Sequence, residues 1–279
     1  MFKIVKKKQL NEQVVLLELE APFIAAKAEA GQFIIFRLDE NGERVPLTIS
    51  DYDREKGTIT IVFQTVGSST TALGKMNEGD SISDVVGPLG TATEYGDNIK
   101  KVAVVGGGVG CAIAYPQAKK LFGLGAEVDL IAGFRSKDIV ILEDEMKKVT
   151  SNLYICTDDG SYGTKGFVTD KLKELIEAGN NYDEVIAIGP VIMMKFISKL
   201  TEAYGIKTIV SLNPIMIDGT GMCGGCRVTV DGKIKYACVD GPDFDGHKVD
   251  FDELIKRNSA YREIESEHIC RLTGGKRHG

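Results

Sequence analysis

The sequence predicts an antiparallel β-barrel, then an α/β domain with a parallel sheet, and finally a small segment rich in cysteine. Short strand-like runs separated by Gly, Asn, Asp and Pro fill the first third of the chain. Apolar strands then alternate with helices, and three of the six cysteines follow within sixteen residues. We therefore divide the chain into residues 1–98, 99–212, 213–245 and 246–279.

Composition narrows the class of protein. The chain has 279 residues with 43% hydrophobic content, enough for roughly two domains. A net charge of -6 argues against nucleic acid as a partner. No apolar run approaches the ~20 residues that span a bilayer, and the start, MFKIVKKKQL, lacks the apolar part of a signal peptide. These observations predict a cytoplasmic protein with no membrane partner.

The barrel is predicted from strand-like runs at residues 14–19, 32–38 and 58–64. No long amphipathic helix interrupts them, and many short strands joined by glycine-rich turns are typical of a small antiparallel barrel. Beyond residue 98, five apolar runs separated by helices read as strands. They are "KKVAVV", "AEVDLIAGF", "LYICTDD", "YDEVIAIGP" and "KTIVSLNP". This alternation predicts a mostly parallel sheet covered on both faces. One helix is expected in the tail, over residues 251–258.

A glycine loop follows the first strand of the α/β domain. Gly107, Gly108 and Gly110 stand between that strand and a helix, where backbone N–H groups can approach a pyrophosphate. The dinucleotide fingerprint is only partly met, because Cys111 occupies the third glycine position. The alternative is an ordinary tight turn. Arg135 ends the next strand where an NAD-type domain usually has an acid, which by that rule favours a 2′-phosphate.

Three loops of the barrel are rich in hydroxyl groups and glycine: "RVPLTIS", "VGSSTTAL" and "GPLG". Each alone is compatible with a hairpin turn. In this order before a glycine loop, they resemble the ferredoxin–NADP reductase superfamily, whose barrel binds FAD and whose second domain binds NAD(P)H. The resemblance implies cofactor contacts from Arg44, Pro46, Leu47, Thr48, Gly67, Ser68, Thr70, Thr71, Gly87 and Gly90.

Two further motifs narrow the resemblance. "TDDGSYGTKGFVTD" and "IGPVIMMK", with the cysteine segment, are similar to the electron-transfer subunit of dihydroorotate dehydrogenase. They are still more similar to the small subunit of NADH-dependent reduced ferredoxin:NADP oxidoreductase, also called sulfide dehydrogenase. The resemblance adds Asp159, Gly189 and Pro190 as nucleotide contacts. Arg44 stands one residue earlier than the flavin-binding arginine of the family, and Ile188 replaces a cysteine that many relatives have.

The cysteine segment has the spacing Asp218-x4-Cys223-x2-Cys226-x11-Cys238. It resembles the plant-type run of [2Fe–2S] ligands with aspartate at the first position. Its glycines let the loop curl around a compact core, and the turn Asp231-Gly232 predicts a hairpin that returns Cys238 to the site. Since a reducing compartment disfavours disulfides, we expect a cluster.

Two alternatives for this segment remain. One is structural zinc held by the three thiolates with Asp218 or His247. The other is three unligated cysteines, with Asp218 serving only as a loop cap. The isolated cysteines Cys111, Cys156 and Cys270 are expected to be packing residues or inert thiols.

The resemblance implies an enzyme that exchanges hydride between NAD(H) and FAD and passes single electrons through the [2Fe–2S] cluster. Its partner would be a large subunit with flavin, iron–sulfur clusters and an NADP(H) site, in an electron-bifurcating heterodimer that reaches ferredoxin indirectly. The resemblance favours NAD(H), against the NADP preference suggested by Arg135. Alternatives are the electron-transfer subunit of dihydroorotate dehydrogenase and a zinc-stabilised nucleotide-binding module without redox turnover.

Overall fold

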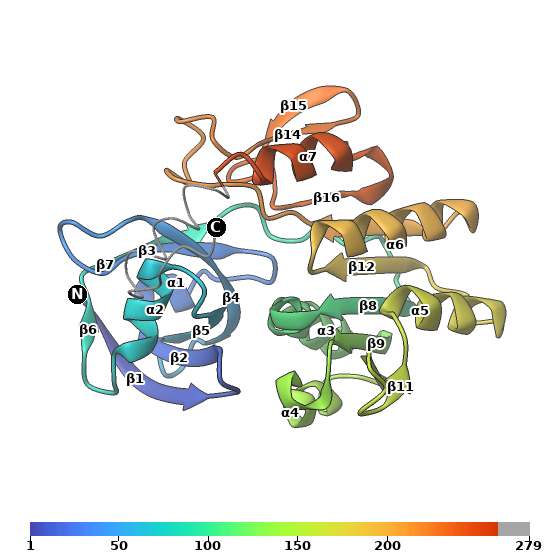
Figure 1. The fold of residues 1–279 in the computed structure, drawn as a ribbon, viewed down its shortest axis with the longest axis horizontal. Helices are drawn as coiled ribbons and strands as arrows, with labels where there is room; N and C mark the ends of the chain where they lie inside the picture. Colours follow the sequence, from blue (N-terminus) through green and yellow to red (C-terminus); the bar gives the residue numbers. More distant parts are fainter. Residues whose placement is uncertain (262–279) are drawn as a thin grey trace, which may run out of the picture.

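A computed structural model describes residues 1–261 and places two sheets side by side (Figure 1). The first sheet is formed entirely by antiparallel pairs in the order β6-β1-β2-β5-β4-β3-β7. Its strands are β1 (Phe2–Gln9), β2 (Val14–Glu20), β3 (Phe33–Arg37), β4 (Val45–Asp53), β5 (Thr58–Gln64), β6 (Ser81–Ile82) and β7 (Asp84–Leu89), with the short helices α1 (Pro22–Ala25) and α2 (Ser68–Lys75).

This sheet curls into the predicted barrel because its strands bury alternate residues. On β2, Val15, Leu17 and Leu19 point inward and are almost fully buried. Helix α2 adds Leu73 to the same core. The edge strands β6 and β7 are adjacent in sequence, so the sheet comes close to closing on itself.

The second sheet has the order β11-β10-β9-β8-β12-β13-β16, and every pair is parallel except the antiparallel β13–β16 pair. The chain leaves β8 toward β9 on one side and later returns to β12 on the other. Its elements are β8 (Lys101–Gly107), η1 (Gly108–Gly110), α3 (Cys111–Gly123), β9 (Glu127–Phe134), η2 (Lys137–Ile139), α4 (Glu143–Lys147), β10 (Asn152–Thr157), β11 (Thr164–Lys165), α5 (Val168–Glu177), β12 (Glu184–Ile188), α6 (Val191–Ala203) and β13 (Lys207–Ser211).

Both faces of this sheet are covered, as the strand–helix alternation predicts. On β8, Val102 and Val104 pack on the side of α3 and α4, whereas Ala103 and Val105 pack on the side of α5 and α6. Burial on both faces explains the continuous apolar runs in the sequence. The predicted fold class, a barrel followed by a parallel α/β domain, is confirmed.

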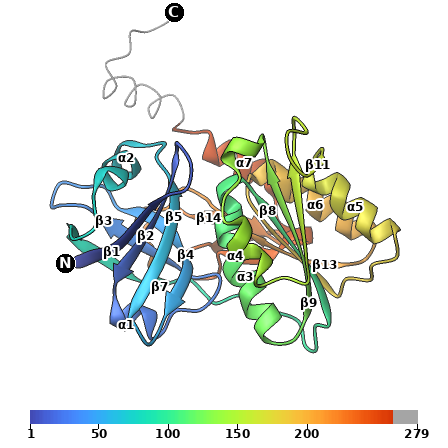
Figure 2. The ribbon, with the colours of Figure 1, turned by 90° about the horizontal axis from the view of Figure 1, so that it is seen from below.

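Helix α3 lies between the two sheets and contacts both β8 and β4 (Figure 2). Two ion pairs join it to the barrel: Lys119 Nζ lies 2.7 Å from Asp51 Oδ1, and Lys120 Nζ lies 3.3 Å from Glu29 Oε2. Each is partly exposed and contributes less than about 1 kcal/mol. The helix therefore positions the barrel mainly by packing.

The cysteine segment forms a hairpin of β14 (Arg227–Val230) and β15 (Lys233–Tyr236), above α6 in Figure 1. Its turn residues Asp231 and Gly232 have φ values of 53° and 68°, as a type I′ turn requires, so the expected hairpin is present. Beyond it lie β16 (Asp243–Asp245), η3 (Gly246–Lys248) and α7 (Phe251–Asn258). The tail helix has the expected bounds, and the four-part domain division remains a prediction.

Within residues 1–261, no helix combines the length and apolar character needed to cross a membrane. Cys270, predicted to be an inert thiol, lies outside the described residues.

Candidate functional site

A cleft of about 1290 Å³ lies between the barrel and the carboxyl ends of the parallel strands. This is the edge at which open α/β sheets bind ligands, because β8 is the strand from which the chain turns first one way and then the other. Nine of the predicted cofactor contacts line the cleft: Pro46, Leu47, Thr48, Gly107, Gly108, Gly110, Arg135, Gly189 and Pro190.

The glycine loop is required by close backbone packing. A Cβ atom on Gly110 would lie 2.5 Å from the carbonyl oxygen of Ile188, and one on Gly106 would lie 2.8 Å from Cys111 Cα. Gly108 has a φ of +57°, which favours glycine. Strand β8 and helix α3 therefore approach closely although Cys111 occupies the third fingerprint position.

Eight predicted contacts do not line the cleft, and their roles remain predictions. Gly67 is the N-cap of α2, with Ser68, Thr70 and Thr71 in its first turn. Gly87 lies within β7 and Gly90 directly follows it. Arg44, on the loop before β4, donates from Nη2 to the backbone oxygen of Asp218 at 3.3 Å. This arginine thus joins the barrel to the cysteine segment.

The eighth is Asp159, which is turned into its own loop. Its Oδ1 accepts hydrogen bonds from the backbone N and the Oγ of Ser161, at 2.9 and 2.6 Å. The neighbouring Asp158 lines the cleft instead. Strands β9 and β10 pair Phe134 with Thr157, so Arg135 and Asp158 follow at the same level of adjacent strands.

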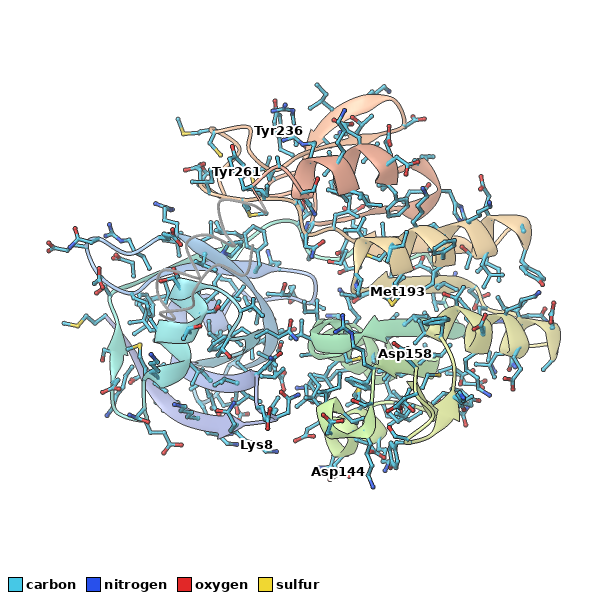
Figure 3. All side chains as sticks on the ribbon, viewed as in Figure 1. Lys8, Asp144, Asp158, Met193, Tyr236 and Tyr261 are labelled. Atoms are coloured by element: carbon cyan, nitrogen blue, oxygen red, sulfur yellow. The ribbon has the colours of Figure 1, made fainter. Side chains whose placement is uncertain are left out.

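Several cleft residues were not predicted from the sequence. The barrel contributes polar groups, and the α/β domain contributes exposed apolar side chains, including Phe167 and Phe196 at 65% and 54% exposure. The signal that could have identified these residues is their position, since many directly follow the carboxyl end of a strand or lie on the outside of the barrel. The unpredicted lining residues include Asn11, Gln13, Phe33, Gln64, Asp158, Phe167, Ile192, Met193, Phe196 and Asn213; Met193 and Asp158 are labelled in Figure 3.

Two cysteines of the segment form a buried pair. Cys226 and Cys238 are each 1% exposed, and the Cys226 thiol donates to Cys238 Sγ at 3.2 Å. They pack with Phe33, Ile35 and Ala237, so the β3 strand of the barrel supports them. Burial, followed by the thiol of Cys226, raises the pKa of Cys238 to about 12.

The other two predicted ligands are exposed. Cys223 Sγ accepts the backbone N–H of Gly225 at 3.4 Å, and the N–H groups of Gly225 and Asp218 lower the pKa of Cys223. The Asp218 carboxylate accepts the hydroxyl of Thr220, and also its backbone N–H at 3.0 Å, which lowers the pKa of Asp218. Asp218 is therefore a loop cap here.

The donor set fits an iron–sulfur centre in part. Within residues 1–261, no three His, Cys, Asp or Glu side chains are arranged around a common metal position. Two thiolates on one tetrahedral metal lie ~3.8 Å apart for metal–sulfur bonds of about 2.3 Å, whereas Cys226 and Cys238 are 3.2 Å apart, so the pair would have to open slightly to hold one metal. Backbone N–H groups directed at Cys223 suit a cluster thiolate as well.

His247 makes a hydrogen bond away from this set. Its Nε2 lies 3.0 Å from Thr201 Oγ1, and Thr208 Oγ1 donates to that same hydroxyl at 2.6 Å. The ring thus joins η3 to α6. This contact weakens the zinc alternative in which His247 is the fourth ligand.

The barrel, the parallel sheet and the cleft between them define a flavin-dependent reductase of the ferredoxin–NADP reductase type. Residues 213–250 match the iron–sulfur cluster binding domain of dihydroorotate dehydrogenase B. The chain belongs to the family of dihydroorotate dehydrogenase B electron-transfer subunits and their homologues. Such a homologue from Thermotoga maritima is 48% identical over 94% of this chain and 92% of its own length.

Two further similarities extend over the full length. An uncharacterised protein in the adh 3′ region of Clostridium beijerinckii is 53% identical, covering 100% of this chain and 96% of its own. A solved structure of NADH-dependent reduced ferredoxin-NADP oxidoreductase, studied for flavin-based electron bifurcation, superposes with a TM-score of 0.92 at 46% identity, covering 98% of both chains. The predicted family, enzyme class and cofactor classes (flavin, iron–sulfur cluster and nicotinamide nucleotide) are confirmed.

Proposed function

We propose that this chain exchanges hydride between NAD(H) and FAD in its cleft and transfers single electrons through a [2Fe–2S] centre to a larger partner subunit. The observation that carries the proposal is the cleft, where strands of the barrel meet the glycine loop across one continuous space. Bound FAD would convert two-electron hydride chemistry into single-electron transfer. The protein residues bind and orient the two cofactors.

The barrel side of the cleft suits a flavin. Pro46, Leu47 and Thr48 line it from β4, and Phe33 lies on the neighbouring β3. Apolar side chains can cover a flat ring while a hydroxyl and backbone groups bond to its edge. The same β3 strand supports the buried cysteine pair through Phe33 and Ile35, so the cleft and the cysteine segment share one wall.

The nucleotide side suits NAD(H). Gly107, Gly108 and Gly110 offer a close approach for a pyrophosphate at the start of α3. Asp158 lies in register with Arg135 and supplies an acid from the adjacent strand. A carboxylate there can accept a ribose 2′-hydroxyl and repels a 2′-phosphate, which supports NAD(H) despite Arg135.

The exposed half of the cysteine segment suits contact with a partner. Around Cys223, the side chains of Ile217, Met222 and Val239 are 57%, 87% and 47% exposed. Exposed apolar clusters mark interaction surfaces. We propose a heterodimer in which the large subunit carries flavin, iron–sulfur clusters and the NADP(H) site, with ferredoxin reached through it. The predicted cytoplasmic location stays a prediction.

One absorption spectrum of the purified chain, with iron and flavin quantified, tests the cofactor assignment. We expect flavin and iron–sulfur absorption with two iron atoms and one flavin per chain, as the proposal states. A colourless protein that holds zinc would instead support the non-redox module. Reconstitution with a partner that oxidises dihydroorotate would favour the second candidate, which the family match of residues 213–250 also supports.

Flavin reduction by NADH and by NADPH tests the nucleotide assignment. We expect NADH to be preferred, and Asp158→Ser to raise the NADPH-to-NADH ratio of kcat/KM at least tenfold, since about 1.4 kcal/mol of lost repulsion is tenfold. Asp159→Ala is the matched control, because that carboxylate is bonded to Ser161. A clear preference of the unaltered protein for NADPH would overturn the NAD(H) assignment.

A further inference from the structure

A buried carboxylate lies where the barrel, the α/β domain and the cysteine segment meet. Asp243 begins β16 and pairs with Ser211 at the end of β13. Its Oδ2 accepts hydrogen bonds from Thr93 Oγ1 and, at 3.4 Å, from Gln117 Nε2. Its Oδ1 is buried and has no hydrogen-bond partner. Although part of the residue reaches the surface, the carboxylate itself is enclosed.

The partners of Asp243 come from the barrel and from the α/β domain, whereas Asp243 itself belongs to the cysteine segment. Thr93 lies on the connection from β7 to β8, and its hydroxyl also accepts from Gln117 Nε2 at 2.6 Å. Tyr95 donates its hydroxyl to Gln117 Oε1. A Cβ atom on Gly31 of the barrel would lie 2.3 Å from Thr93 Oγ1 and 2.9 Å from Asp243 Oδ2. The barrel backbone thus closes directly over the carboxylate.

The groups that face the carboxylate are neutral near pH 7. They are the hydroxyls of Thr93 and Ser211, the amide of Gln117 and, behind the amide, the phenol of Tyr95. Burial raises the pKa of Asp243 to about 6, and the nearby polar groups of Ser211, Thr93 and Gln117 offset this only in part.

The charged groups of the surrounding elements have other partners. On α3, Lys119 and Lys120 pair with Asp51 and Glu29. Glu184 of β12, which acts on Tyr95, pairs with Lys207 of β13. On β16 itself, Asp245 pairs with Lys248. Ionised Asp243 therefore has no counter-ion among the described residues.

The backbone next to Asp243 holds the cysteine segment in place from two sides. Thr91 N donates to Gly241 O at 2.7 Å from the barrel exit, and Leu212 N donates to Pro242 O at 2.9 Å from β13. Gly241 and Pro242 follow Cys238 by three and four positions, and Thr91 Oγ1 also donates to Val239 O at 3.2 Å. We therefore expect a weaker hydrogen-bond network at Asp243 to weaken the hydrogen bonds of Gly241 O and Pro242 O as well.

We propose that Asp243 is a proton-dependent anchor of the cysteine segment: the protonated carboxyl completes a neutral hydrogen-bond network that ties the segment to both domains, and loss of the proton weakens that junction. When protonated, Oδ2 donates to Thr93 Oγ1, which is then free to donate to Ala30 O at 3.3 Å. The description of the segment as an electron exit rests on the proposed function, but the anchor itself does not.

The direction of the pH effect follows from the raised pKa. The folded protein holds this proton more tightly than the unfolded chain, so the stabilisation is complete below the usual value of 3.8 and is lost as pH rises through about 6. Between pH 5 and 7.5, one such group changes the unfolding equilibrium constant about tenfold. Asp243→Asn keeps a neutral donor at this position and removes the titration.

Urea unfolding of the full-length protein with its cofactors, at pH 5 and 7.5, tests the proposal. We expect the ratio of unfolding constants, wild type over Asp243→Asn, to rise about tenfold between these pH values. Asp252→Asn is the control, because that α7 carboxylate is 80% exposed and pairs with Lys195 on the surface. A ratio that does not change with pH would overturn the proposal.

Hydrogen exchange in the wild type gives a second readout that needs no variant to fold. Protection of the Thr91 and Leu212 amides, relative to their intrinsic rates at each pH, should fall with a midpoint near 6. Constant protection from pH 5 to 7.5 would overturn the proposal. Hydrogen exchange of these amides does not measure flavin reduction or iron content, so a failed redox assignment is seen separately in the absorption spectrum.

Discussion

The two halves of the cysteine segment differ in how they are held. Cys226 and Cys238 are buried against the barrel strand β3, and their sulfurs already lie 3.2 Å apart. Asp218 and Cys223 are exposed on a glycine-rich loop and are oriented by local hydrogen bonds. Burial in the core thus positions one half, and local hydrogen bonds, with a contact from Arg44, orient the other.

This difference indicates which half is preorganised. The hydrophobic core positions the buried pair, because Cys226 and Cys238 pack against Phe33 and Ile35. Both hydrogen bonds from Thr220 go to Oδ2 of Asp218, so Oδ1 can bind a metal without breaking them if Asp218 is a ligand. The exposed half is also the side on which a partner can reach the segment.

The largest expected difference is in thiol reactivity. In iron-free protein at pH 8, alkylation of Cys223 should exceed that of Cys238 by about 1,000-fold, since only the thiolate reacts. The pKa of Cys223 is lowered from 9.0, whereas burial raises the pKa of Cys238 to about 12. Alkylation of Cys223 should also slow as pH falls. Peptide mass spectrometry measures both, and faster labelling of Cys238 would contradict the comparison.

Replacing one thiol in each half should separate the effect of packing on stability from the effect of metal ligation on iron content. We expect Cys226→Ser to lower the free energy of unfolding by about 1–3 kcal/mol, because a buried hydroxyl loses part of its hydrogen bonding. The matched Cys223→Ser change should cost less than about 0.5 kcal/mol at its exposed position. Both should lower iron per chain if both are ligands. Equal losses of stability in iron-free protein would argue against a preorganised buried half.

Two glycines of the loop provide a smaller test. Gly219 has a φ of +81°, and a Cβ atom there would lie 2.4 Å from Ile35 Cδ1. Gly224 has a φ of +67°, but its nearest neighbour would be 3.8 Å away. We expect Gly219→Ala to cost about 2–3 kcal/mol and Gly224→Ala about 1 kcal/mol, the latter from the left-handed conformation alone. Thermal unfolding compares them, and a larger cost at Gly224 would show that the loop does not rest on β3.

At Asp218 we expect a smaller effect on the fold than at either glycine. Asp218→Ala removes an exposed loop cap and should cost the iron-free protein about 0.5–1 kcal/mol. If the carboxylate is a ligand, the same change should also lower iron occupancy or shift the potential of the centre. Asp218→Asn retains the oxygen acceptor for Thr220 and serves as the control. If the spectrum and potential of Asp218→Ala are unchanged, Asp218 is a loop cap and not a ligand.

Much of the fold, and nine of the residues that line the cleft, could be predicted because they depend on local signals. Buried strands, the glycine loop and the turn at Asp231-Gly232 are written in periodicity and in backbone preference. The sequence predicts Asp159 as a nucleotide contact and does not single out Asp158, because neighbouring carboxylates look alike in a sequence; the role of Asp159 stays a prediction. Only the register of β9 and β10, with the bond from Asp159 to Ser161, decides which one faces the cleft.

The sequence by itself determined the class of protein, the spacing of the four candidate ligands and the hairpin that carries Cys238. Only the tertiary structure decided that Cys226 and Cys238 are buried against β3, that Arg44 contacts the cysteine loop, and that Asp243 is enclosed. The physical reason is that ligand spacing is a local property of the chain. Burial and the partners of a charge depend on segments that are distant in sequence, such as the bond between Thr93 and Asp243 across 150 positions.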